Sequence, residues 1–311
     1  MAASANDADV QAALSAADTR MRECNMTPHH LNGDDYRAAP MVDEAFVADC
    51  LATDGSKLVL LGDSFAGVIG KHVAYAAHDL GYEFTMLNGY HCPYPLDTYG
   101  QLLSAKQSEC EVDPQFLQRA VMSSLNSGDI VILRLYFSNP VYLRLAEQDW
   151  ERALAFYDEE LNSLHKQVKQ KGASLLVVGS NATAMIPPDC QFQKRFNYPS
   201  RDPQVCESAT IDMASERVNR FAIEHNQHLA EVLSSKDETL SFIDPMAYLC
   251  SEDLTSCLLT DEGTPLMADD QHLAEITVDK VYPTLVSTLK QLSMNSLNVT
   301  LDATERSTLP N

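Results

Sequence analysis

The sequence predicts a three-layer α/β/α sandwich built on a mostly parallel sheet of five strands. Five short apolar runs of the kind that is buried on both faces recur along the chain, and stretches with helical spacing of apolar residues separate them. This alternation is typical of a parallel sheet that helices cover on both sides. With 311 residues, 45% of them hydrophobic, the chain is long enough to bury such a core.

The alternation begins at residue 57. Lys57-Leu-Val-Leu-Leu61 predicts the first strand, which ends in Gly62-Asp63-Ser64, and residues 66–80 then predict a helix. The other expected strands lie near 82–88 and at 129–136, 174–178 and 239–243. The other expected helices lie near 114–126, 147–171, 208–235 and 273–292.

We expect one large domain over residues 46–294. A polar, acidic arm at 1–45, with a weak helix at 10–20, precedes it, and a disordered tail at 295–311 follows it.

Two long segments, 89–112 and 180–207, interrupt the alternation directly after strands. Parallel sheets build their sites at the carboxyl ends of strands, so both segments are candidate substrate walls. Insertions without a role in chemistry explain them equally well.

The charge of the chain excludes some partners. A formal net charge of −22 repels a nucleic-acid backbone or an anionic membrane surface at long range, so we expect no nucleic-acid partner. Solubility alone also explains the acidity. The first residues have neither the basic nor the apolar region of a signal peptide, and no apolar run is long enough to span a membrane.

The eight cysteines favour disulfides over a metal site, because they lie in loop-like surroundings and none forms a CxxC pair. Sequential pairing is the simplest of the possible connectivities. It would join Cys24 to Cys50, Cys92 to Cys110, Cys190 to Cys206, and Cys250 to Cys257.

Oxidised cysteines imply an extracytoplasmic protein whose export signal or membrane part was removed or belongs to a longer parent chain. Three N-glycosylation patterns, at Asn25, Asn181 and Asn298, add slight support for a secretory route and a glycoprotein.

Gly62-Asp63-Ser64 predicts a reactive serine. In the turn between the first strand and its helix, the Ser64 hydroxyl would lie at the edge of the sheet, where the helix N-terminus stabilises a developing negative charge. Such a hydroxyl needs a base, and the base needs a group that orients it. His272 and Asp269, just before the last helix, supply both, with Asp270 as the weaker orienter. Taken singly, each motif is also typical of a helix cap.

With these residues the chain resembles the SGNH (GDSL-like) hydrolases, which place GDS after the first strand and DxxH before the last helix. It resembles in particular the SGNH domain that follows the membrane-embedded acyltransferase-3 domain of carbohydrate O-acyltransferases. The resemblance covers roughly residues 45–292. It rests on Cys50, Leu58 to Ser64, Cys92-Pro93, Asp244-Pro245 with Cys250 and Cys257, and Asp269 to Leu273.

The resemblance implies a flavodoxin-like fold, with Ser64 as nucleophile, His272 as base and Asp269 as its orienter. It implies Gly89 as an oxyanion donor. The third block departs from the family pattern, because residues 134–139 contain no glycine. Asn139 as an amide donor, or Arg134 as a positive charge, remain the alternatives there. The usual histidine after GDS is Phe65, to which we assign no role.

The sequence thus predicts a serine esterase or O-acyltransferase that acts on O-acyl groups of carbohydrates, with O-acetyl as the expected group, and that needs no metal or cofactor. A membrane-embedded acyltransferase domain is the expected partner. Two alternatives remain open: a catalytically silent SGNH-like domain that binds glycan, and an interaction module in which GDS and DDQH are only helix caps.

Overall fold

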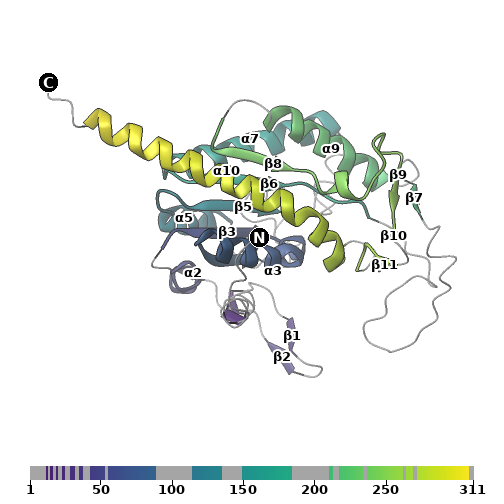
Figure 1. Ribbon diagram of the computed structural model, residues 1–311, viewed down its shortest axis with the longest axis horizontal. Helices are drawn as coiled ribbons and strands as arrows, with labels where there is room; N and C mark the ends of the chain where they lie inside the picture. Colours follow the sequence, from purple (N-terminus) through teal and green to yellow (C-terminus); the bar gives the residue numbers. More distant parts are fainter. Residues whose placement is uncertain are drawn as a thin grey trace, which may run out of the picture.

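The computed structural model describes a five-stranded parallel sheet with helices on both faces (Figure 1). The order of the strands is β4-β3-β5-β6-β8, and each neighbouring pair is parallel. The strands are β3 (Lys57–Gly62), β4 (Glu83–Asn88), β5 (Ile130–Arg134), β6 (Ser174–Val178) and β8 (Leu240–Ile243). The described residues are 12, 15, 16, 19, 23, 24, 29–31, 35–37, 43–52, 55–88, 114–134, 149–183, 210–212, 217–233, 237–261, 264–268 and 272–307.

Two helices, α3 (Ser64–Leu80) and α10 (Glu275–Ser307), cover the face of the sheet that is in front in Figure 1. The opposite face packs mainly against α2 (Glu44–Leu51), α5 (Pro114–Ser124), α7 (Trp150–Gln170) and α9 (Arg217–Leu233). The three-layer α/β/α fold predicted from the sequence is therefore confirmed.

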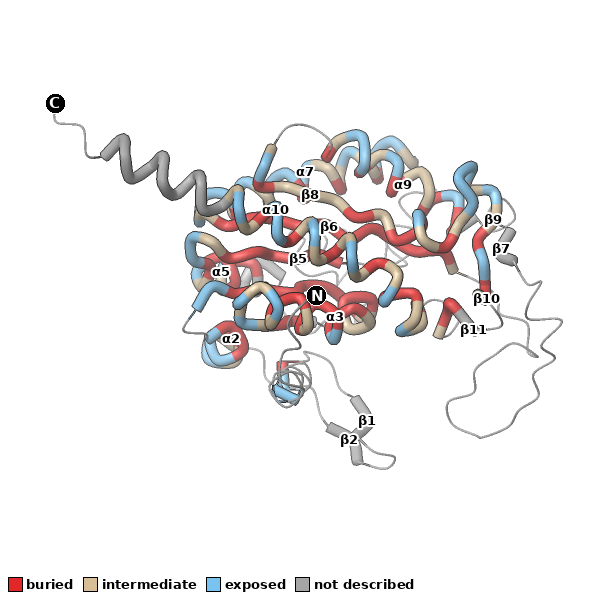
Figure 2. Tube along the Cα trace, in the orientation of Figure 1, coloured by how far each residue is buried: buried red, intermediate tan, exposed pale blue. Residues whose placement is uncertain are grey.

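Strand β3 shows why the predicted strands are continuous apolar runs. Its side chains alternate between the two cores: Leu58 and Leu60 pack on the side of α3 and α10, and Val59 packs on the side of α5 and α7. All six of its residues are buried, as the red tube in Figure 2 shows. A strand buried on both faces needs apolar residues at nearly every position, and the exception, Lys57, is paired with Asp129.

The chain leaves β3 first for β4 on one side and later returns to β5 on the other side of β3. The carboxyl ends of β3 and β5 therefore form the point where the strand order reverses. Sheets of this type bind ligands at that point.

The structure differs from the expected elements in two regions between β6 and α10. The helix expected near 208–235 begins only at Arg217, because β7 (Thr210–Asp212) pairs with β9 (Ser256–Leu258) as an antiparallel ribbon. The short pair β10 (Thr260–Asp261) and β11 (Thr264–Pro265) was not predicted either. The strands of the ribbon pair at long range, and those of the short pair have only two residues each, so apolar periodicity shows neither.

Helix α10 runs to Ser307, past the end expected at residue 292 and into the segment expected to be a disordered tail. Residues 284–307 contain neither glycine nor proline, so nothing in the sequence interrupts the helix. The domain boundaries themselves remain predictions.

The remaining short elements are a hairpin and a 3₁₀ turn. A hairpin joins β1 (His29–Leu31) to β2 (Asp35–Arg37), and the 3₁₀ turn Pro245–Tyr248 follows β8. Among the helices that the structure describes, none has the length and apolar character to cross a membrane.

Among the described residues there are two disulfides, Cys24–Cys50 and Cys250–Cys257, and both are among the four sequential pairs predicted. The first attaches the N-terminal segment to α2, and the second closes the loop between the 3₁₀ turn and β9. Cys92, Cys110, Cys190 and Cys206 lie outside the described residues.

Candidate active site

The turn between β3 and α3 requires glycine at position 62. Gly62 has a φ of +149°, and an added Cβ would lie 1.8 Å from the carbonyl oxygen of Arg134, its neighbour on β5. No other residue fits between the two strands at this point. The close approach of β3 and β5 therefore fixes where the chain turns, and with it the position of Ser64.

Asp63 fixes the first turn of α3. Its side chain accepts a hydrogen bond from the backbone N–H of Phe65 at 2.9 Å, as an N-cap does. Its carbonyl oxygen accepts from the N–H groups of Ala66 and Gly67. The N–H of Ser64 makes no hydrogen bond to a described residue and so remains available to an anion at the helix N-terminus.

His272 lies against Ser64. Its Nε2 is 2.9 Å from the Ser64 Oγ, within hydrogen-bond distance. His272 belongs to the segment between β11 and α10. There its carbonyl accepts from the N–H of Ala268, and Leu273 pairs with Met267 as an isolated bridge. The structure therefore brings the expected nucleophile and base together, and this geometry suits proton transfer from serine to histidine.

The first turns of α10 are attached to α3 close to this contact. The Nε2 of His72 lies 2.8 Å from the Oδ1 of Asp279, and Lys71 forms an ion pair with Glu275. Ser64 begins α3 and His272 lies three residues before α10. The contacts between the two helices therefore hold the two reactive groups in place.

An open pocket lies over this pair and encloses about 870 Å³ of empty space, its opening included. From Ser64 it follows one face of α3 for two turns, to the ion pair of Lys71 and Glu275. Gly67, Val68, Ala268 and Leu273 also line it. The pocket thus combines small or apolar walls beside the serine with charged groups about 10 Å away.

Phe65, to which the sequence assigned no role, packs against His272. The centroids of the two rings are 4.7 Å apart, and the ring planes are inclined by 36°. In the sequence, only the position of Phe65 directly after the serine distinguishes it. Its contact with His272 depends on the fold, which brings the two segments together.

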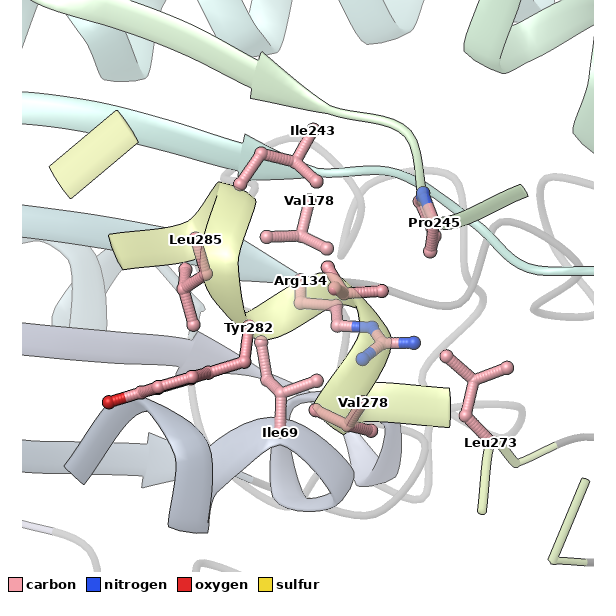
Figure 3. Close-up of a pocket in the computed structure, with 10 residues that line it drawn as sticks. Ile69, Arg134, Val178, Ile243, Pro245, Leu273, Val278, Tyr282 and Leu285 are labelled. Atoms are coloured by element: carbon pink, nitrogen blue, oxygen red, sulfur yellow. The ribbon is translucent and has the colours of Figure 1, made fainter. Parts of the chain in front are cut away.

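Arg134 lies behind Phe65 rather than in the open pocket. Its side chain is buried, and its Cζ is 5.9 Å from the centroid of the Phe65 ring. Figure 3 shows the guanidinium in an apolar pocket beside Leu273 and Val278. Burial lowers the pKa of Arg134 to about 10, and the Asp63 carboxylate opposes this shift.

Asn181 holds this guanidinium and is not an acceptor for a glycan. The Nη2 of Arg134 donates to the Oδ1 of Asn181 at 2.9 Å, and the Asn181 side-chain amide donates to the carbonyl of Ala182. Asn181 is 1% exposed. The glycosylation predicted at Asn181 is therefore wrong, since a modified asparagine must be accessible. Asn25 is not among the described residues, and neither is the side chain of Asn298.

Four other predicted site residues lie outside the described residues: Gly89, Asn139, Asp269 and Asp270. Their assignment as oxyanion donors and orienters remains a prediction, and so do the roles of Ser64 and His272 in a reaction.

Comparison with known proteins identifies a family for this chain. The family model of the SGNH domain fused to AT3 domains matches residues 30–283. Among curated proteins, none matches the chain in sequence.

Among solved structures, the periplasmic domain of a lipopolysaccharide acetyltransferase from Salmonella ser. Paratyphi A is similar in fold. Its TM-score is 0.51 at 13% sequence identity, over 89% of this chain and 97% of that one. The likeness to this structure concerns the fold alone, whereas the family model matches most of the chain, and this chain therefore belongs to the family of SGNH domains that are fused to AT3 domains.

Proposed function

We propose that the chain is a serine esterase or O-acyltransferase that acts on O-acyl groups of carbohydrates through an acyl-Ser64 intermediate. The observation that carries the proposal is the 2.9 Å contact between the Ser64 Oγ and the His272 Nε2 at the edge of the sheet. A serine hydroxyl becomes an effective nucleophile when a positioned base removes its proton.

In the first half of the reaction, the Ser64 Oγ attacks the carbonyl carbon of the ester while His272 Nε2 takes the hydroxyl proton. The negative charge that develops on the carbonyl oxygen faces the start of α3, where the Ser64 N–H is available. Gly89 and Asn139 are proposed as further donors to this oxygen. The intermediate then expels the alcohol, which takes the proton from His272, and leaves the acyl group on Ser64.

In the second half, water or an acceptor hydroxyl gives its proton to His272 and attacks the acyl-serine. The bond from the acyl carbon to Ser64 breaks, and the serine recovers its proton. Asp269 is proposed to orient His272 and to stabilise its protonated form. None of these steps requires a metal.

The family match supports the choice of partner, and the similar structure supports the choice of substrate. Domains of this family are fused to AT3 domains, so we propose a membrane-embedded acyltransferase domain or protein as the partner. The similar Salmonella domain belongs to a lipopolysaccharide acetyltransferase, which favours an acetylated carbohydrate. The periplasmic location of that domain and the two disulfides also support an extracytoplasmic location.

Hydrolysis of p-nitrophenyl acetate at neutral pH, with the disulfides kept oxidised, tests the proposal. Ser64→Ala and His272→Ala should each lower kcat/KM by more than about a thousandfold. Ser123→Ala is the matched control, because Ser123 is exposed on α5 and, within the described part of the chain, its hydroxyl bonds only to the carbonyl of Ala120. Equal rates for wild type and Ser64→Ala would reject the proposal. A glycan-binding assay would then test the catalytically silent alternative.

A further inference from the structure

Phe65 is joined to the nucleophile, Ser64, through the backbone, and its ring contacts the base, His272. It follows Ser64 directly, is 2% exposed, and its N–H is bonded to the Asp63 carboxylate. The same capped turn therefore fixes the serine hydroxyl and the aromatic ring beside His272.

The contact with Ser64 does not by itself fix the imidazole. The hydrogen bond at Nε2 restrains the direction of that nitrogen and leaves the plane of the ring to the other contacts of His272. Contact between the rings of Phe65 and His272 restricts this tilt, since paired aromatic rings favour a narrow range of arrangements.

The Phe65 ring also has a contact of its own with Arg134. The Arg134 guanidinium lies near its ring, and Asn181 holds the guanidinium through Nη2. A cation beside an aromatic ring is attracted to the ring electrons, most strongly where water is excluded. These contacts link the end of β5, the loop after β6 and the start of α3 to the segment that carries His272.

We propose that Phe65 is a positioning residue. It holds the His272 imidazole in the orientation in which Nε2 faces the Ser64 Oγ, and Arg134 holds the Phe65 ring in place. This inference rests on the proposed function, because it concerns the same serine and histidine.

Phe65→Leu removes the ring and keeps an apolar side chain of similar size. The first measurement is the rate at which a fluorophosphonate labels Ser64, followed by intact mass. In this reaction the Ser64 Oγ forms a bond to phosphorus, the P–F bond breaks, fluoride leaves, and His272 takes the serine proton. The labelling rate should fall about tenfold, as expected for the loss of one aromatic contact.

Turnover of p-nitrophenyl acetate should show the same change in kcat with little change in KM, because the contact matters only when the proton moves. Phe65→Tyr keeps the ring and should restore most of both rates. Phe242→Leu is the control: Phe242 packs against the core on the other face of the sheet and should cost neither rate. Phe65→Met is a second ring-free variant in case Phe65→Leu does not fold.

An NMR measurement separates this proposal from the proposed function. The ring protons of His272 should shift in Phe65→Leu and stay unchanged in Phe242→Leu, because the ring current of Phe65 acts on them when the two ring centroids are 4.7 Å apart. Unchanged His272 signals, or labelling at the wild-type rate in folded Phe65→Leu, would overturn the role of Phe65 and leave the proposed function intact. If the fluorophosphonate does not label wild type, and Ser64→Ala hydrolyses the ester at the wild-type rate, the proposed function itself is overturned.

Discussion

The Oγ of Ser64 and the Nε2 of His272 are 2.9 Å apart although 208 positions separate them in the chain. Two structural features produce this contact. Gly62 allows the turn that places Ser64 at the end of β3, and polar contacts between α3 and α10 hold the segment of His272 beside it. Each feature leads to a test.

Gly62→Ala should destabilise the fold by about 3 kcal/mol, because its Cβ would overlap the carbonyl of Arg134 and force β3 and β5 apart. Ester hydrolysis should fall as well, since Ser64 moves with the turn. Gly81→Ala is the control, because Gly81 also has a positive φ, +72°, but has no atom within 4 Å of the added Cβ. It should cost only about 1 kcal/mol of backbone strain. Urea unfolding of both variants measures the difference, and equal losses would contradict the steric explanation.

Asp279→Ala should lower the free energy of unfolding by about 1–2 kcal/mol, because it leaves the buried Nε2 of His72 without its partner. Glu275→Ala, which breaks the exposed pair with Lys71, should cost less than about 0.5 kcal/mol. Chemical unfolding at neutral pH compares the two. A larger loss in Glu275→Ala would show that burial does not decide the strength of these contacts.

Lys57→Met should cost about 3–5 kcal/mol. The Nζ of Lys57 lies 2.9 Å from the Oδ2 of Asp129, and both side chains are buried at the amino ends of β3 and β5. Removing the lysine leaves a buried carboxylate without its counter-charge. Activity per folded molecule should stay unchanged, since Lys57 and Asp129 lie at the amino ends of the strands and Ser64 lies at the carboxyl ends.

Lys169→Met is the comparison for that variant, because Lys169 pairs with Asp237 at 2.7 Å while remaining half exposed. It should cost less than about 1 kcal/mol. Thermal melts of the two variants supply the data, and similar losses would argue against the importance of burial.

His225 should make the fold less stable in acid. Burial, with a smaller contribution from His228, lowers its pKa to about 3, and its ring packs edge-on against Tyr157. Below the ordinary histidine pKa of 6.5, the unfolded chain binds a proton that the folded protein excludes, so stability is lost as the pH falls from about 6.5 towards 3.

Between pH 7 and pH 5, wild type should therefore lose about 2 kcal/mol more than His225→Phe, which cannot titrate. Urea unfolding at the two pH values checks this. Parallel losses in both proteins would mean that His225 does not cause the acid sensitivity.

The sequence alone determined the layers of this fold. Strands buried on both faces are apolar at nearly every position, so the runs at residues 58–61 and 175–178 identify them directly. Local chemistry also marked Gly62, Asp63 and Ser64, because a strand-to-helix turn needs a glycine and a cap wherever it occurs. The antiparallel ribbon of β7 and β9 was missed because its strands pair with each other at long range.

Only the tertiary structure decided which residues meet at the site. The contact of Phe65 with His272, and the burial of Asn181 against Arg134, depend on the order of the strands and the packing of α10 on α3. No local spacing encodes these contacts, because each joins segments that become neighbours only when the sheet has formed. The sequence therefore determined where a serine and a histidine were available, and folding decided what surrounds them.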